Sequence, residues 1–412
     1  MKTPRAAGIY VHVPFCRSIC AYCDFPRVQA DVPPTESYTR AVVAEILGYE
    51  DPAEDASGFE TRGALTVYFG GGTPSQLDPP QVGRIVDAVA RRFALVEGAE
   101  VTLEANPGDL DVARVRGYRA AGVNRLSLGV QSFRDAFLRF LDRRHTAAEA
   151  RAAFDAAREG GIDNVSIDLI YGLPDQTAAM WREDLEEVRR WAPAHLSAYA
   201  LSMEEGSHLT ARWRAGEVAI PGDEEAEAMW LAFEDAAPWL DGYEISNFTL
   251  DGRRAEHNGL YWRWMPYLGF GAAAHSFLPD AKDGGLRWSN AADPGRYMAA
   301  VGEGSAPSGG SERLTARTAL ADYILTRLRV REGFGEDDFA LRFGAPFDAL
   351  AGPRLARWVD AGLLRRRAGR VQATRRGWFV SNGLFGDVVS TLEGALTSIG
   401  ATSTLEGRGS VP

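Results

Sequence analysis

The sequence predicts an α/β fold, in which an open, six-stranded (β/α)6 partial barrel precedes a small C-terminal winged-helix-like domain. Apolar runs rich in β-branched residues alternate with helix-like stretches through the first half of the chain, and this order is typical of parallel β/α units. The alternation repeats six times, whereas a closed barrel of this kind needs eight units. Near the C-terminus the order changes to three helices and a hairpin, which indicates a winged helix.

The six predicted strands and the helices between them define the barrel. We expect strands at residues 8–13, 65–69, 100–104, 125–130, 165–170 and 196–201. We expect helices at residues 37–48, 79–92, 109–121, 147–160 and 177–190. Ligands of such folds bind at the carboxyl ends of the strands, so functional residues should follow the strands directly.

The rest of the chain divides into further regions. The barrel domain is predicted at residues 1–205, and an aromatic-rich extension of it at 206–301. A linker rich in glycine and serine, 302–311, leads to the winged-helix-like domain at 312–385, with helices at 315–330, 335–343 and 353–361 and a hairpin at 363–373. Residues 386–412 are rich in glycine, serine and threonine, and we expect them to form a flexible tail.

The composition is that of a globular protein in the cytoplasm. Of the 412 residues, 45% are hydrophobic and 25% are charged, which is ordinary for a globular domain. A net charge of −11 argues against nucleic acid as a general partner. No apolar run approaches the roughly 18–20 residues that span a membrane, and the N-terminus lacks the apolar core of a signal peptide. We therefore expect a reducing, cytoplasmic location.

All three cysteines of the chain, Cys16, Cys20 and Cys23, lie within eight residues of one another. Three thiols cannot all pair as disulfides, and a structural zinc site usually takes four ligands. Three thiolates on one loop suit a 4Fe–4S cluster that leaves one iron open for a ligand. The alternative is three buried or incidental thiols, but chance rarely confines every cysteine of a chain to one loop.

A run of glycines, Gly70, Gly71 and Gly72, follows the second predicted strand and precedes Thr73. Glycines allow positive φ and let the backbone approach a ligand closely, although a tight turn also explains them. No Gly-Lys-Ser/Thr follows, so the run is not a phosphate-binding loop. Together with the C-x3-C-x2-C spacing and Tyr22 before the third cysteine, the run resembles the radical S-adenosyl-L-methionine (SAM) superfamily. The resemblance implies a cluster on the three cysteines, whose open iron binds SAM and whose electron cleaves SAM to a deoxyadenosyl radical.

Polar residues at or just past the later strands complete the expected SAM pocket. They are Glu104, Gln131, Arg143 and Asp168. Carboxylates can accept hydrogen bonds from ribose hydroxyls or from an ammonium group, and arginine can pair with a carboxylate through two N–H groups. For Arg143 the alternative is an ion pair with an acidic neighbour on a surface helix. Asp168 lies in an apolar strand, where an unpaired carboxylate is costly, so we expect it to have a ligand.

The order and spacing of these residues resemble one branch of the superfamily, that of the oxygen-independent coproporphyrinogen III oxidase and its relatives. The resemblance covers residues 8–385 and implies a partial TIM barrel in which these four residues and Tyr22 contact SAM. The oxidase has a fourth cysteine one residue beyond the third, but here Asp24 and Phe25 follow Cys23. The oxidase also has a long segment ahead of the cluster, whereas only fifteen residues precede Cys16 here.

A second motif points to another group in the same branch. His257, Tyr261 and Trp262 stand in the sequence His-Asn-Gly-Leu-Tyr-Trp. It resembles a motif of the HemW-type haem chaperones, where it is associated with haem binding. Imidazole is a common axial ligand of haem iron, and aromatic rings can stack on a porphyrin. The alternative is an ordinary hydrogen-bonding histidine. Pro266 and Ala273 depart from the pattern of that group, so a divergent subgroup with its own substrate remains open.

Three hypotheses follow. The first is a haem chaperone that binds a 4Fe–4S cluster, SAM and haem as its cargo, and delivers haem to an acceptor such as a membrane respiratory enzyme. Its further partner is an electron donor. The second is the oxidase itself, which decarboxylates porphyrinogen propionates, and the third is a radical SAM enzyme with another substrate. We assign no catalytic residue, and turnover of SAM stays open.

Arginines cluster on and beside the predicted hairpin. They are Arg365, Arg366, Arg367, Arg370, Arg375 and Arg376. Six arginines can meet phosphates, but the acidic chain favours a solvated or docking surface. We expect this domain to act as a lid or a partner-docking unit.

Overall fold

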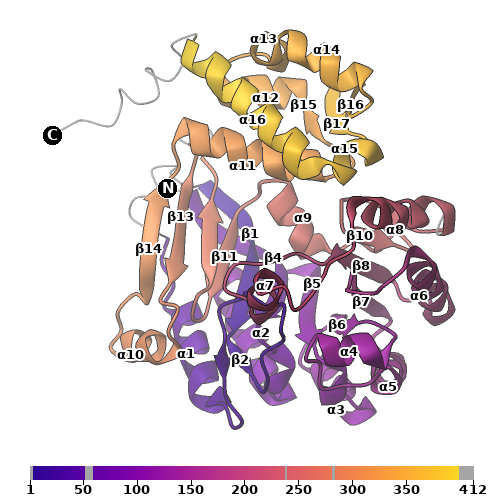
Figure 1. Cartoon of the computed structure of the whole chain (residues 1–412). Coiled ribbons are helices and arrows are strands. Elements are labelled where there is room, and N and C mark those ends of the chain that lie inside the picture. The colour runs from indigo at the N-terminus through magenta and orange to yellow at the C-terminus, as the bar shows by residue number, and fades with distance from the viewer. Residues whose placement is uncertain (1–2, 52–58, 237–238, 281–283, 399–412) are drawn as a thin grey trace.

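The computed structural model describes residues 3–51, 59–236, 239–280 and 284–398 (Figure 1). Within these ranges, one mixed sheet of twelve strands has the order β14-β13-β12-β11-β1-β4-β5-β6-β7-β8-β10-β9 and does not close on itself. Six of its strands run parallel in chain order: β1 (Thr3–Val13), β4 (Phe59–Gly71), β5 (Leu95–Ala105), β6 (Arg125–Gln131), β7 (Asn164–Tyr171) and β8 (His195–Ala200). They contain or overlap the six predicted strands, so the open (β/α)6 architecture is confirmed.

Helices that follow these strands pack against the sheet. They are α1 (Thr35–Leu47), α2 (Pro79–Phe93), α3 (Val112–Ala120), α5 (Ala147–Glu159) and α6 (Ala178–Trp191). In α2, Val82, Ile85 and Val89 recur at helical spacing and are fully buried. Reciprocal capping boxes begin α2 and α5, where Asp78 and Thr146 satisfy free N–H groups of the first turn. The sequence therefore sets where each strand-to-helix loop ends.

Shorter strands extend the sheet at both edges. At one edge β11 (Tyr267–Phe270) runs parallel to β1, and β12 (His275–Leu278), β13 (Leu286–Asn290) and β14 (Ser308–Arg313) follow antiparallel. At the other edge lie β10 (Asn247–Thr249) and β9 (Asp241–Gly242). The predicted linker 302–311 is wrong for residues 308–311, which belong to β14. All six residues of β14, two of which are glycines, are exposed. The strand therefore has no apolar pattern and is held by backbone pairing with β13.

Further helices connect these parts. They are α4 (Asp135–Phe140), α7 (His208–Arg214), α8 (Asp223–Ala236), α9 (Glu256–Trp262) and α10 (Pro294–Gly302). Helix α9 contains the His-Asn-Gly-Leu-Tyr-Trp sequence and packs between strand β4 and helix α11 of the C-terminal domain. None of the helices in the described ranges is both long and apolar enough to cross a bilayer.

The C-terminal domain has its own core and lies over one end of the barrel (Figure 1). Its elements are α11 (Ala316–Arg329), β15 (Phe334–Gly335), α12 (Glu336–Phe343), α13 (Phe347–Ala351), α14 (Pro353–Asp360), β16 (Leu364–Arg367), β17 (Arg370–Ala373), α15 (Arg375–Phe379) and α16 (Ser381–Ser398). The predicted flexible tail is wrong for residues 386–398, which form most of α16. Val388 and Leu392, spaced four residues apart, are buried against this core. Residues 399–412 lie outside the described residues.

Candidate functional site

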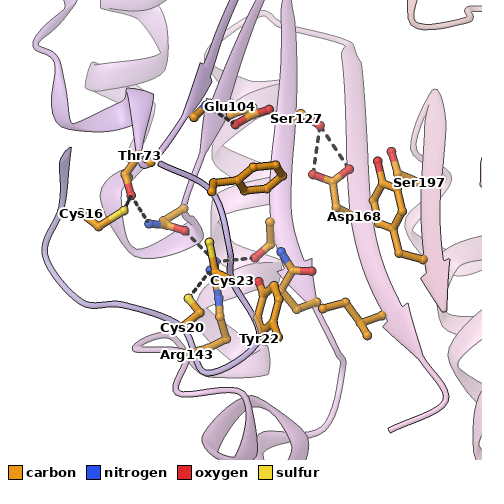
Figure 2. A pocket seen from close by; sticks show the side chains of 18 of the residues that line it. Cys16, Cys20, Tyr22, Cys23, Thr73, Glu104, Ser127, Arg143, Asp168 and Ser197 are labelled. Carbon is orange, nitrogen blue, oxygen red and sulfur yellow. Dashed lines mark hydrogen bonds between the residues drawn. The ribbon is translucent and has the colours of Figure 1, made fainter. Parts of the chain in front are cut away.

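The loop after β1 brings the three cysteines to one cavity. Cys16 ends the short strand β2 (Phe15–Cys16), which pairs with β3 (Val28–Gln29) and so holds the two ends of the loop together. Cys16 is buried, Cys20 and Cys23 are half-buried, and all three are free thiols. They line a cavity of about 930 Å³ at the mouth of the barrel (Figure 2).

The three thiols are a donor set that fits an iron–sulfur cluster. Among the described residues, no three His, Cys, Asp or Glu side chains converge closely enough to hold one ion. Polar neighbours orient two of the sulfurs: Thr73 Oγ1 lies 3.5 Å from Cys16 Sγ, and Arg143 Nη1 lies 3.3 Å from Cys20 Sγ. Three thiols that face one cavity without converging are the donor set that a multi-iron cluster requires.

The glycine run lies beside the cysteine loop, at positions where a larger residue would clash with its neighbours. Gly71 has φ of +114°, and a Cβ atom at this position would lie 2.6 Å from the ring of His12. A Cβ at Gly72 would lie 2.8 Å from the carbonyl oxygen of Phe15. Gly71, Gly72 and Thr73 line the cavity, whereas Gly70 does not. The run therefore presents bare backbone to a ligand.

Arg143 connects the cysteine loop to the strand ends. Besides Cys20, its guanidinium donates to Asn106 Oδ1 at 2.6 Å and to the carbonyl oxygen of Gly129 at 2.8 Å. The alternative of an ion pair with an acidic neighbour on a surface helix is therefore wrong. The remaining predicted residues Tyr22, Glu104, Gln131 and Asp168 also line this cavity.

Gln131 ends β6 with φ of +65°, a left-handed conformation that costs a non-glycine residue energy. The turn directs the chain out of the strand and toward the loop that carries Arg143. Ser127, Gly129 and Gln131 alternate along β6, and all three line the cavity. This period-two pattern is the signal from which Ser127, which we did not predict, could have been found.

Two half-buried carboxylates face the cavity. Glu104 accepts from the Tyr68 hydroxyl at 2.7 Å and from the Gly71 N–H at 3.3 Å. Burial, together with the nearby charge of Asp168, raises the pKa of Glu104 to about 7. Burial also raises the pKa of Asp168, although hydrogen bonds from Ser197 and Ser127 oppose the shift; the Ser127 hydroxyl lies 3.0 Å from one oxygen (Figure 2). A cationic ligand group bound between the two carboxylates would stabilise their ionised forms.

Replacing Glu104 with glutamine should change how stability depends on pH. The raised pKa means that the folded protein binds a proton more tightly than the unfolded chain does. Stability from this group is therefore lost as pH rises from about 4.5 to about 7. We expect urea unfolding to show that Glu104→Gln gains up to about 3 kcal/mol relative to the wild type between pH 5 and pH 8. If the difference in free energy of unfolding between Glu104→Gln and the wild type stays constant across that range, the raised pKa of Glu104 is contradicted.

The structure does not bring the haem-associated residues to this cavity. His257 is fully buried against the barrel wall. Its Nδ1 lies 2.7 Å from Thr66 Oγ1, and its Nε2 lies 2.8 Å from the Tyr261 hydroxyl. Burial lowers the pKa of His257 to about 3, and its ring stacks on Tyr68 at 5.0 Å between centroids. In this conformation neither ring nitrogen is free to ligate iron, which is the arrangement of an ordinary hydrogen-bonding histidine.

Comparisons with known proteins identify the family of this chain. The family model of the radical SAM superfamily matches residues 10–188, and that of the HemN C-terminal domain matches residues 314–380. The Heme chaperone HemW of Lactococcus lactis is 31% identical over 387 residues, which are 93% of this chain and 97% of that protein. The HemW of Mycobacterium tuberculosis is 34% identical over 394 residues, 94% and 95% of the two chains.

The chain belongs to the HemW family. This HemW-family chain shares its fold with the solved structure of coproporphyrinogen III oxidase (HemN) from Escherichia coli, described as a radical SAM enzyme. The TM-score is 0.75 and the identity is 21%, over 95% of this chain and 90% of that one. The predicted architecture, a partial barrel of the radical SAM type with a HemN-type C-terminal domain, is thereby confirmed.

Proposed function

We propose that the protein holds a 4Fe–4S cluster on Cys16, Cys20 and Cys23 and binds SAM beside it. The observation that carries this proposal is the single cavity that the three free thiols share with Gly71 and Gly72, Arg143 and two half-buried carboxylates. When bound, the cluster supplies the electron for reductive cleavage of SAM.

The chain's own residues would bind and orient SAM. The backbone of Gly71 and Gly72 leaves room for the methionyl part, and Glu104 offers a fixed carboxylate to its ammonium group. Arg143, charged at neutral pH, is placed to attract a carboxylate. Asp168 can accept hydrogen bonds from ribose hydroxyls at the far side of the cavity.

We further propose that the protein binds haem as cargo and delivers it to an acceptor protein, such as a membrane respiratory enzyme. The support is the family: the relatives from Lactococcus lactis and Mycobacterium tuberculosis, each aligned over more than nine-tenths of both chains, are named heme chaperones. A cytoplasmic location, where thiolates stay reduced, suits both the cluster and such a role.

An anaerobic haem titration of the cluster-loaded protein tests the cargo proposal. We expect a saturable, stoichiometric shift of the Soret absorption band, because a specific site fills once per chain. Adding SAM and a reductant in the same experiment shows whether deoxyadenosine forms, which decides turnover separately. The absence of saturable haem binding in the wild type would overturn the chaperone proposal.

One observation favours the oxidase as a second candidate. The cavity extends beyond the expected SAM residues to Tyr199, Ser246, Asn258, Arg329 and Asn382, so it has room for a further ligand beside SAM. Incubation with coproporphyrinogen, SAM and a reductant, followed by analysis for vinyl products, distinguishes the two. We expect no vinyl product, and its formation would make this protein an oxidase.

A further inference from the structure

A second cavity, which we call the seam cavity, lies where the barrel extension meets the C-terminal domain. Its volume is about 530 Å³, within the range of roughly 300–1,000 Å³ that is usual for small-molecule sites. Its walls come from α9, from α11 and the residues that follow it, and from β17. Charged and aromatic side chains dominate the lining: Tyr243, Trp262, Arg254, Arg263, Arg327, Arg370, Glu256 and Glu332.

The charge of the seam cavity is opposite to that of the protein. Four arginines and two glutamates line it, which leaves two uncompensated positive charges on a chain whose net charge is −11. Low-dielectric walls focus such a local field and raise the local concentration of anions. An anionic ligand is therefore the chemistry that this cavity favours.

Two of these arginines donate hydrogen bonds to backbone carbonyl oxygens. Among the residues that the structure describes, Arg327 and Arg370 form no ion pair. Arg327 Nη1 donates to the carbonyl oxygen of Trp262 at 3.2 Å, and Arg370 Nε donates to the carbonyl oxygen of Glu332 at 2.7 Å. Burial lowers the pKa of Arg327 and the nearby charge of Arg370 acts in the same direction, whereas Tyr323 and the carboxylate of Asp338 oppose the shift. Two positive charges that lie close together in a partly enclosed space repel each other, and a bound anion would offset this repulsion.

Trp262 supplies a flat apolar wall to the same cavity. It is half-buried, and the guanidinium of Arg329 lies over its ring, 4.6 Å from the centroid. Its buried indole N–H has no hydrogen-bond acceptor among the described residues. Indole rings contact planar aromatic ligands over a large area. Helix α9 thus presents His257 to the barrel wall and Trp262, five residues later, to the seam cavity.

We propose that the seam cavity binds the carboxylate-bearing edge of a planar aromatic macrocycle, with Arg327 and Arg370 on the carboxylates and Trp262 against the ring. This inference rests on the proposed haem-binding function and names the site for it. Haem has this chemistry, because two propionates extend from one edge of its ring. Recognition through carboxylates and ring surface requires no iron ligand, which agrees with the engaged nitrogens of His257.

The test uses three ligands on the cluster-loaded protein under anaerobic conditions. They are haem, iron-free protoporphyrin IX, and the dimethyl ester of protoporphyrin IX, which has the same ring without the negative charges. We expect Arg370→Gln to weaken haem and protoporphyrin binding by about tenfold or more and to leave the weaker binding of the dimethyl ester unchanged. Trp262→Leu should weaken all three. Arg365→Gln is the matched control, since Arg365 lies on the adjacent strand and bonds only to Gln372 in the described contacts.

Each outcome separates this inference from the function on which it rests. If the wild type binds haem and both variants bind it equally well, haem binds elsewhere and the seam cavity is excluded, while the chaperone proposal survives. If the wild type binds no haem, the proposed function fails first and the inference fails with it. Equal urea midpoints of the variants and the wild type show that any loss of affinity is local.

Discussion

Replacing Cys16 with alanine should abolish cluster binding. Cys16 is one of only three thiols in the chain, and no other thiol can take its place. We expect bound iron and sulfide after anaerobic reconstitution to fall by more than about tenfold, because even losing a residue that only supports a ligand costs 10–100-fold in metal affinity. Iron and acid-labile sulfide analysis, with the visible absorption spectrum, measures this.

Two further variants show whether loss of the cluster comes from loss of the Cys16 thiol or from misfolding. Cys16→Ser keeps the volume of the side chain, so it should fold normally and still lose the cluster. Thr73→Val removes the hydroxyl that contacts Cys16 Sγ but keeps all three thiols, so it should retain a cluster of lower affinity. Full iron and sulfide loading of Cys16→Ala would mean that these cysteines do not hold the cluster.

Replacing His257 with alanine should destabilise the fold, whatever it does to haem. The imidazole is fully buried and bridges Thr66 and Tyr261. Its loss leaves a cavity and two buried hydroxyls without their partner, so we expect the free energy of unfolding to fall by about 2–4 kcal/mol at neutral pH. Urea unfolding measures this, and His208→Ala, at an exposed position of α7, should stay within about 0.5 kcal/mol of the wild type.

The same variant has a defined pH dependence. The pKa of His257 is lowered to about 3 in the folded protein, so the unfolded chain binds the proton more tightly. The stability that the neutral imidazole contributes is fully present above about pH 6.5 and is lost as pH falls toward 3. The difference between wild type and His257→Ala should therefore shrink on acidification. A His257→Ala variant as stable as the wild type at pH 7 would contradict the buried, bonded placement.

This result bears on how haem binding is interpreted. If His257→Ala loses haem affinity together with stability, the loss does not identify an iron ligand. Iron-free protoporphyrin decides between the two explanations, because it cannot form an axial bond. Equal losses for haem and protoporphyrin indicate damage to the fold around α9, whereas a loss confined to haem indicates ligation after rearrangement.

The sequence predicted the parts of the fold that depend on local pattern. In strands such as β7, the buried apolar residues Val165, Ile167 and Leu169 alternate with polar ones, and this period of two indicates a strand directly. Strand β14 could not be found this way, because its exposed Ser-Gly-Gly-Ser-Glu-Arg sequence is held only by pairing with β13. Helix α16 had a signal in Val388 and Leu392, but the glycine, serine and threonine around them concealed it.

The residues of the candidate site were also predicted only in part from the sequence. The cysteines and the strand-end residues were found because parallel strands bring their carboxyl ends to one mouth. The inward-facing residues of the strand bodies, such as Ser127 and Tyr68, were missed because attention to strand ends excluded them. The motif around His257 suggested a ligand, but only the fold shows that β1 and β4 enclose this ring.

Glu244 joins the C-terminal domain to the barrel. This carboxylate, from the barrel extension, has a fully buried side chain and pairs at 2.6 Å with Arg329, the last residue of α11. Movement of the C-terminal domain away from the barrel would break this ion pair and expose both charges to water. The lid role that we predict for this domain therefore requires the Glu244–Arg329 pair to open. The loop between β2 and β3, where Ile19 and Phe25 are exposed, borders the cysteine cavity through Cys20 and Cys23.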